Sequence, residues 1–513
     1  MLQSKCGSRC NGVFPLQYSV TARGSQISMW SLVTITNGVV TRPLRVAWTL
    51  KSQAVAADSW SATSATLSTL ALNPEPLTIA LSADELHRTL TSDNPVAQRY
   101  VDALRNFLAS PQHRVMPMGA RAMDYGSLRA RGLGVDIPQH FIVVEQLLGE
   151  VTSESRMTDA VFLPGVVGST SAAAVDHQGR HVIVIGEEAL RSAPSRTLGW
   201  GSPFRLVGVP ASARALAVDS PLSALANRND IEPGRLAALT MGTLSMLYYQ
   251  APNARSPRTE VITTNLDQAS PTFTTELASA LRASPLLTQR SIDASATIAQ
   301  IGQNRSPALR SLASAPVAPW RTSEITTLAN LKRDAASLIS TFSTPAPFLR
   351  IQMARLQAEV GLRSHANGVA NAQRVLRDEL AKFRIDQSTV ILASATGTIP
   401  VTLYSSADYG ITGLIRVSAD RIEFPDGQVI PVGILTQTAS TPISATMTRG
   451  TSSLMTIRLT TTDGRVVIAT GTIQVRYTSA SVVGYALSAG SLLVIAWWWW
   501  RTTRRKSPGR HAR

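Results

Sequence analysis

The segment from Thr478 to Trp500 constrains this chain more than any other, because its 23 residues (TSASVVGYALSAGSLLVIAWWWW) carry no charge. As a helix rising about 1.5 Å per residue, it is long enough to cross a hydrocarbon core of about 30 Å. Four tryptophans end it, and six Lys and Arg residues without an acid follow in 501–513. Tryptophan favours the headgroup level, and basic residues favour the cytoplasmic side. The pattern predicts one C-terminal transmembrane helix over 478–500; the alternative is a buried core helix.

The residues expected at the membrane interface follow from this segment, and the lipid bilayer is the first predicted partner. They are Trp497, Trp498, Trp499, Trp500, Arg501, Arg504, Arg505 and Lys506. A basic cytoplasmic tail over 501–513 implies an extracytoplasmic body and a single-pass protein of the cell membrane. The start MLQSKCGSRCNGVFPLQ, however, lacks the apolar core of a secretory signal. Either the true start lies upstream of Met1, which we favour because the chain opens within β-like sequence, or the protein is a tail-anchored scaffold with a cytoplasmic body.

Composition argues against two classes of protein. The formal charge is +16, but no basic stripe interleaved with aromatic residues occurs, and only five of the 49 Lys and Arg residues are Lys. Nucleic acid is therefore not an expected partner. Cys6 and Cys10 are the only cysteines, and no His or other Cys lies near them. No zinc site and no cofactor are expected, and the redox state of the two thiols stays open.

The hydrophobic pattern predicts a mixed architecture in which a β/α barrel-like domain comes first. Residues 1–41 alternate like two or three strands and are interpreted as the remnant of an N-terminal β domain. Residues 42–291 alternate short apolar strands with helical stretches, which favours a parallel sheet covered on both faces and closed or nearly closed as a barrel. The seven strands expected there are 45–50, 77–81, 114–119, 159–165, 181–186, 214–219 and 260–265.

The rest of the chain reads as helical and then all-β. Residues 292–320, rich in Ser, Ala and Pro, form a connector, and 321–386 form a helical section expected to lean on the barrel. Eight short strands over 387–477, with turns at Asp426-Gly427 and Asp463-Gly464, fit an immunoglobulin-like β-sandwich. The predicted fold class is therefore α/β plus all-β, with one C-terminal transmembrane helix.

The chain from about Phe14 onward resembles a known family. The stretches TGTIPVTLYSSADYGITGLIRVS and LTTTDGRVVIATGTIQVRYTS, followed by the apolar segment and the basic tail, are similar to uncharacterised actinobacterial cell-envelope proteins whose genes often neighbour the lipid II flippase. Weaker likenesses are RPLRVAWTL, LTIALSADEL and VMPMGARAMDYGSL. The resemblance implies a signal peptide, a place in the envelope, and a cell-wall glycan or a cell-wall precursor export protein as partner. It implies no settled activity.

Catalytic groups of a β/α barrel follow the carboxyl ends of its strands, so the acids there are the candidates. They are Asp84, Asp124, Glu187, Glu188, Asp219 and Asp267. Relatives in the resembling family carry acids where this chain has Ser82 and Ala120, and most of the remaining acids also suit helix starts. If the chain is an enzyme, Asp124 and Asp219 are the expected catalytic residues.

The histidines and short motifs add no chemistry. His177 and His181 are four residues apart, but Gln-Gly between them indicates a turn, so no metal is expected. The stretch GVVGST at 165–170 lacks the lysine of a phosphate loop.

We therefore expect an envelope protein that is more likely not an enzyme and that binds a glycan or a protein partner. The first alternative is a membrane-anchored carbohydrate-active hydrolase, and the second is the cytoplasmic scaffold. Two carboxylates meeting in one pocket at the carboxyl end of the barrel would favour the hydrolase.

Overall fold

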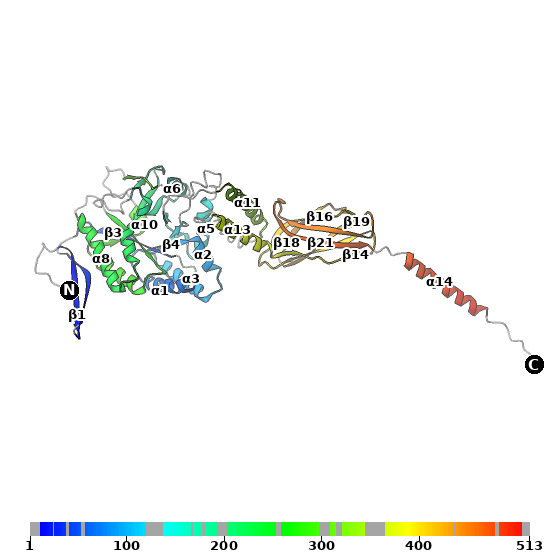
Figure 1. Ribbon diagram of the computed structural model, residues 1–513, viewed down its shortest axis with the longest axis horizontal. Helices are drawn as coiled ribbons and strands as arrows, with labels where there is room; N and C mark the ends of the chain where they lie inside the picture. Colours follow the sequence, from blue (N-terminus) through cyan, green and yellow to red (C-terminus); the bar gives the residue numbers. More distant parts are fainter. Residues whose placement is uncertain are drawn as a thin grey trace, which may run out of the picture. The chain divides into compact units, whose positions relative to one another are not determined.

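The structure is a computed structural model of the whole chain, and its elements are drawn in Figure 1. It describes residues 11–23, 25–36, 40–52, 57–119, 137–165, 168–176, 180–191, 203–210, 212–252, 258–296, 308–313, 321–343, 365–435, 437–477 and 482–504. The chain forms two compact units. Unit 1 comprises 1–326 and 356–369, and unit 2 comprises 327–355 and 370–513.

Unit 1 contains a closed barrel of seven parallel strands, which confirms the expected barrel. Its strands, in spatial order, are β3 (Leu44–Lys51), β4 (Thr78–Ser82), β5 (Arg114–Met118), β6 (Ala160–Leu163), β7 (Val182–Gly186), β9 (Arg214–Val218) and β10 (Thr259–Asn265). The barrel closes because β10 pairs in parallel with β3 from Thr259 beside Arg45 to Asn265 beside Lys51. A short extra strand, β11 (Leu287–Gln289), pairs with the start of β3. Each strand that the apolar runs predicted is present.

Helices cover the outside of this barrel because parallel strands bury both faces. They are α1 (Ala57–Leu70), α2 (Ala83–Leu90), α3 (Pro95–Ala109), α5 (Ile137–Gly149), α6 (Ser169–Asp176), α7 (Ser220–Ala226), α8 (Pro233–Gln250) and α9 (Pro271–Ala283). Short elements complete the unit: η3 (Glu154–Arg156), η4 (Glu187–Ala189), β8 (Arg205–Leu206) and β12 (Leu309–Arg310). Side-chain oxygens of Ser82, Asn94 and Ser270 accept hydrogen bonds from the first turns of α2, α3 and α9, so each of these residues caps the start of its helix.

The barrel interior is filled by apolar side chains, among them Ala47, Val184, Val261 and the larger Phe162. Helix α10 (Ile292–Ala296) follows β11 and adds Ile292 and Ala296 to the same cluster. Burial and nearby Asp159 raise the pKa of Asp293 in α10 to about 6, against the opposing effect of Arg114 and Arg180. Because Asp159, Arg114 and Arg180 stand at the amino ends of strands, α10 closes that end of the barrel.

A two-stranded hairpin precedes the barrel, formed by β1 (Gly12–Ala22) and β2 (Ser25–Ile35). It packs on α8, where Arg235 Nε donates to the carbonyl oxygen of Trp30 at 2.9 Å and the Tyr249 hydroxyl donates to that of Ile35 at 3.0 Å. Gly242 lies on the contact face, because a Cβ added there would lie 2.4 Å from Leu32 Cβ.

Unit 2 is rich in sheet. One sheet has the order β13 (Phe383–Ile385), β15 (Thr396–Ser405), β19 (Thr438–Met447), β17 (Ile422–Glu423); the other has β14 (Val390–Leu392), β21 (Val467–Tyr477), β20 (Ser452–Thr460), β16 (Ile411–Ser418), β18 (Val429–Leu435). Side chains from both sheets share one core. Gly427 and Gly464 adopt positive φ at the two predicted turns. That this sandwich is immunoglobulin-like stays a prediction.

The helices α11 (Thr322–Ile339) and α13 (His365–Leu380) contribute to the core of unit 2. That the helical section leans on the barrel stays a prediction. Ala335 and Leu338 of α11 are part of it. Ser337 Oγ donates to Asp463 Oδ1 at 2.6 Å, and the Tyr409 hydroxyl donates to Glu379 of α13 at 2.5 Å. These polar contacts therefore fix both helices to the sheets.

The predicted membrane segment forms helix α14 (Val482–Thr503), on which Trp497 to Trp500 are exposed and the guanidinium groups of Arg501 and Arg504 lie over Trp497 and Trp500. Within the described ranges, no helix combines the length and apolar character that a membrane crossing requires. The expectation of a transmembrane helix over 478–500 is thus not supported here. Arg505, Lys506, Cys6 and Cys10 lie outside the described residues.

We expect Gly242→Ala to detach the hairpin from α8. Alanine favours a helix interior by about 1 kcal/mol, but its Cβ would overlap Leu32, and such overpacking costs about 1–3 kcal/mol. Limited proteolysis at Arg23 should therefore become faster. Gly234→Ala, in the same helix, is the matched control, because a Cβ added there would lie no closer than 3.4 Å to a neighbouring atom. An unchanged cleavage rate in Gly242→Ala would contradict the contact.

Candidate carboxylate pocket

Strand register brings three acids to one level of the barrel. Gly186 at the end of β7 pairs with Val218 at the end of β9, and Val218 pairs with Val261 in β10. Glu187 and Asp219 follow the first two strands directly, and Glu260 comes one residue before Val261. Val261 points into the barrel, so the alternation along a strand directs Glu260 to the outer face. All three acids line one pocket on that side.

Helix α7 shapes the pocket because it continues where β9 stops. Ser223 Oγ accepts a hydrogen bond from the amide of Thr263 at 3.0 Å. Asn227 donates to the carbonyl of Thr263 at 2.9 Å and accepts from the amide of Asn265 at 2.6 Å. These side chains satisfy the edge of β10 that a longer β9 would have paired. A helix in place of strand pairing opens space beside the start of β10.

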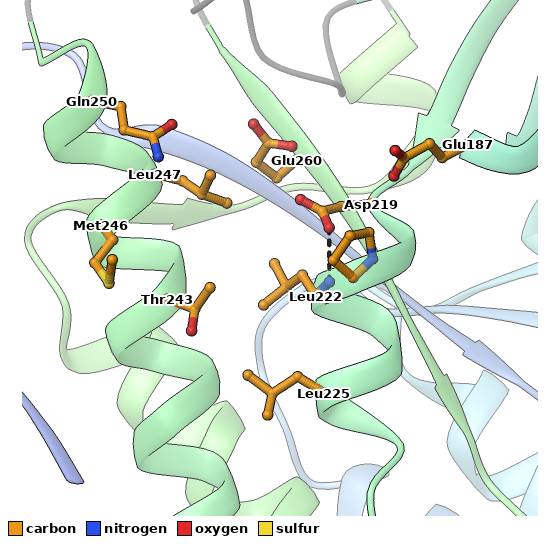
Figure 2. Close-up of a pocket in the computed structure, with 10 residues that line it drawn as sticks. Glu187, Asp219, Leu222, Leu225, Thr243, Met246, Leu247, Gln250 and Glu260 are labelled. Carbon is orange, nitrogen blue, oxygen red and sulfur yellow. Dashed lines mark hydrogen bonds between the residues drawn. The ribbon is translucent and has the colours of Figure 1, made fainter. Parts of the chain in front are cut away.

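The pocket has a volume of about 250 Å³ and lies between α7, α8 and β10. Its walls combine apolar side chains of the two helices with a few polar groups, as Figure 2 shows. The lining residues besides the three acids are Pro221, Leu222, Leu225, Thr243, Met246, Leu247 and Gln250. Such a combination of apolar walls and few polar groups is typical of small-molecule sites.

The start of α7 holds two of the acids in place. Asp219 is buried, and its Oδ1 accepts a hydrogen bond from the amide of Leu222 at 2.8 Å. Glu187 Oε2 accepts from the amide of Ser220 at 3.4 Å. Hydrogen bonds from backbone amides and the positive end of a helix both favour the ionised form of a carboxyl group. We therefore expect Asp219 and Glu187 to be negatively charged at neutral pH.

Glu260 has the opposite environment. Its side chain is fully buried, and neither carboxyl oxygen accepts a hydrogen bond from a described residue. Arg258 Nη2 lies 3.9 Å from Oε1, but the Nη1 atom of the same guanidinium donates to the carbonyl of Leu247 at 2.7 Å. Burial first and the charge of Asp219 second raise the pKa of Glu260 to about 8, although Arg258 acts in the other direction. At neutral pH this carboxyl group is therefore mostly protonated.

The structure brings together only some of the acids expected from the sequence. Asp219 and Glu187 meet in the pocket, and Asp219 is the N-cap of α7 as its sequence position indicated. Glu188 is exposed, and its Oε2 accepts from the Ser220 hydroxyl at 3.0 Å. Asp267 lies in the turn after β10 and does not line the pocket. Asp124, like the side chain of Asp84, lies outside the described residues.

Glu260 is the pocket residue that sequence reasoning missed. It occupies the second position of β10, whereas we considered only acids beyond strand ends. The sequence did contain a signal for it. Glu260 is an acid within an apolar run that predicts a buried strand, and acids are rarely buried unless they are paired.

The structure gives no evidence for a metal centre in the part of the chain that it describes. His181 is exposed at the start of β7, and His177 is outside the described residues. Within the same residues, no three His, Cys, Asp or Glu side chains form a group suited to a metal ion.

No family model matches the sequence, and no curated protein matches it. Several solved structures align with this chain at low identity. A 4-alpha-glucanotransferase from Thermococcus litoralis is 8% identical over 81% of this chain and 85% of its own, with a TM-score of 0.43. An alpha-mannosidase from Enterococcus faecalis is 8% identical over 82% and 61%, with a TM-score of 0.41. A maltose-forming amylase from Pyrococcus is 10% identical over 63% and 68%, with a TM-score of 0.38.

The expectation that the chain is more likely not an enzyme is corrected by these findings. Its premise was that each remaining acid could be explained by its position at a helix start. The chain instead forms a closed parallel β/α barrel, an architecture in which active sites lie at the carboxyl ends of the strands. Glu187 and Asp219, both at carboxyl ends of barrel strands, share one pocket with Glu260. Capping α7 does not remove Asp219 from the pocket, because a cap uses only one carboxylate oxygen.

The pH dependence of the free energy of unfolding of unit 1 should show whether Glu260 is protonated in the folded state. The folded-state pKa of about 8 exceeds the value of about 4.3 for a free Glu, so the folded state binds this proton more tightly. Its contribution to stability is complete below the unfolded pKa and is lost as the pH rises through the folded pKa. In Glu260→Gln the side chain stays neutral, so between about pH 5 and 8 its free energy of unfolding should fall less than that of the wild type, by several kcal/mol.

Denaturant unfolding of both proteins across this pH range measures the difference. Glu276→Gln, which changes an exposed acid of α9, should keep the wild-type pH dependence. Equal slopes for wild type and Glu260→Gln would show that Glu260 is not protonated in the folded state.

Proposed function

We propose that this chain is a carbohydrate-active enzyme that cleaves or transfers a glycosidic bond in the pocket beside α7. The observation that carries the proposal is a pair of buried carboxyl groups, Glu260 and Asp219, that line one pocket in different environments. Burial and the charge of Asp219 raise the pKa of Glu260 to about 8. Glycoside cleavage needs one carboxylic acid and one carboxylate, and their environments must keep the two pKa values apart.

The roles follow from the two environments. Glu260 donates its proton to the leaving glycosidic oxygen while the bond from that oxygen to the anomeric carbon breaks. Asp219 stabilises the positive charge that develops on the sugar ring, and a water or a second sugar hydroxyl then attacks the anomeric carbon. The proton of that nucleophile returns to a carboxylate, which restores the starting state. The sequence-based alternative paired Asp124 with Asp219; this proposal keeps Asp219 and gives the acid role to Glu260.

The remaining walls suit a sugar. Leu222, Leu225 and Met246 offer apolar surface to the C–H face of a pyranose ring, while Thr243 and Gln250 offer hydrogen bonds to its hydroxyl groups. A cell-wall glycan is the substrate class that the family resemblance suggests.

We expect Glu260→Gln and Asp219→Asn each to lower kcat on oligosaccharide substrates by about 10²–10⁴-fold, the usual contribution of a positioned acid or base. Asn at 219 keeps an oxygen that can accept the Leu222 amide, so the fold should persist. The wild-type rate should fall as the pH rises through about 8, where Glu260 loses its proton. Release of reducing ends from peptidoglycan and arabinogalactan fragments measures turnover.

Glu188→Gln is the matched control, because Glu188 lies next to the site without lining the pocket. It should retain wild-type kcat. Turnover that survives in both Glu260→Gln and Asp219→Asn would place the chemistry elsewhere, and no turnover by the wild type on any glycan would remove the proposal.

We also propose that α14 holds the protein at a cell membrane, with the body outside the cytoplasm and the C-terminus inside. The proposal is supported by the exposed apolar side chains of Leu492, Leu493 and Ile495 and by the basic residues that follow Trp500. The lipid bilayer and a cell-wall precursor export protein remain proposed partners.

Thiol labelling tests this location. In a chain whose native cysteines are removed by Cys6→Ser and Cys10→Ser, the exposed turn substitution Thr462→Cys should react with an impermeant reagent on intact cells. Ser507→Cys in the tail should react only after lysis. Labelling of Thr462→Cys only after lysis would favour the cytoplasmic scaffold instead.

A further inference from the structure

We propose that the pocket selects a sugar that carries a protonated amino group, that is, an amino sugar with a free amine, and that Glu187 determines this specificity. The inference rests on the proposed function, since it names the substrate class of the same site. It derives from the charge of the pocket walls and from a buried carboxyl group that lacks hydrogen-bond donors.

The charge of the pocket is one-sided. Each titratable residue that lines it, Glu187, Asp219 and Glu260, is an acid, and the other lining residues are neutral. Arg258 lies behind Glu260, outside the lining, and its guanidinium donates to the carbonyl of Leu247. Two carboxyl groups suffice for glycoside cleavage, so the third acid has no role in the bond-breaking step.

Glu260 provides a second, independent indication of a ligand. It is fully buried, it lines the pocket, and both of its oxygens lack a hydrogen-bond donor among the described residues. Buried polar atoms without partners are uncommon and cost about 1–3 kcal/mol each. A ligand removes this cost when it offers a donor to the accepting oxygen of Glu260 and an acceptor to its O–H, and an ammonium group carries three donors.

The geometry of Glu187 suits the binding role. Its carboxylate is half-buried and directed toward the pocket from the end of β7, opposite α8 (Figure 2). One of its oxygens, Oε2, accepts from the Ser220 amide, which fixes the group in place. A fixed carboxylate in a partly dry pocket attracts an ammonium group and repels the carboxylate or phosphate of an acidic sugar.

Amine binding also tunes the acid. The charged groups that act on Glu260 are Asp219, which raises its pKa, and Arg258, which lowers it. A ligand cation beside Glu187 adds a second lowering influence, so the pKa of Glu260 should move from about 8 toward neutrality. A general acid is most effective when its pKa is close to the working pH.

Binding of three monosaccharides to the full-length chain tests the proposal without requiring turnover. Glucosamine, N-acetylglucosamine and glucuronic acid are titrated separately at neutral pH, and ligand-observed NMR gives each affinity. Glucosamine should bind at least about tenfold more tightly than N-acetylglucosamine, because a charged hydrogen bond contributes more than about 1.4 kcal/mol. Glucuronic acid should bind most weakly.

Glu187→Gln should abolish the preference for the amine while N-acetylglucosamine binds as before, since Gln still offers an oxygen to the Ser220 amide. Glu188→Gln, which changes the neighbouring exposed acid, should leave the preference intact and so exclude a general surface charge effect. Equal affinities for the two sugars, binding of neither, or a preference that persists in Glu187→Gln would each overturn the proposal.

The two proposals fail separately. Preference for glucosamine without cleavage of any oligosaccharide would remove the proposed enzyme activity and leave the amine site standing. Cleavage of neutral glycans without preference for the amine would remove the amine site and leave the proposed enzyme activity standing.

Discussion

Closure of the parallel sheet is the constraint on which unit 1 depends. A parallel sheet cannot leave a face in water, and the continuous pairing of β10 with β3 removes both edges at once. The interior is then filled by apolar side chains of the strands, mostly Ala and Val together with Met116, Met118 and Phe162. Polar groups are pushed to the strand ends and to the layer between strands and helices.

One departure from regular closure creates the pocket. Strands β9 and β10 share a single register pair, Val218 with Val261, and beyond it α7 takes over through Ser223 and Asn227. A regular barrel would fill this space with strand pairing. Because α7 takes the place of further strand pairing, Glu260 is buried without a hydrogen-bond donor and Asp219 lies beside it. The unusual proton affinity of Glu260 is therefore a consequence of how the barrel closes.

Much of this fold could be predicted from the sequence, because apolar runs and helix-start signals are local. The seven strands and the caps at Ser82, Asn94, Asp219 and Ser270 are examples. The pocket could not be predicted, because it depends on the relative stagger of β7, β9 and β10. Local patterns do not encode that stagger, so an acid in the middle of a strand looked less informative than acids beyond the strand ends. The α11 and α13 contacts with the sheets of unit 2 were missed for the same reason, since amphipathic helices reveal an apolar face but not its partner.

The central claim is that Glu260 carries a proton at neutral pH inside a pocket with an ionised Asp219. The most direct measurement is carbon NMR of the glutamate side-chain carboxyl groups, with the Glu260 resonance assigned by its loss in Glu260→Gln. The account predicts a chemical shift typical of a protonated carboxyl at neutral pH and a titration midpoint near about 8. A midpoint near about 4.3, the value of an unperturbed Glu, would contradict it.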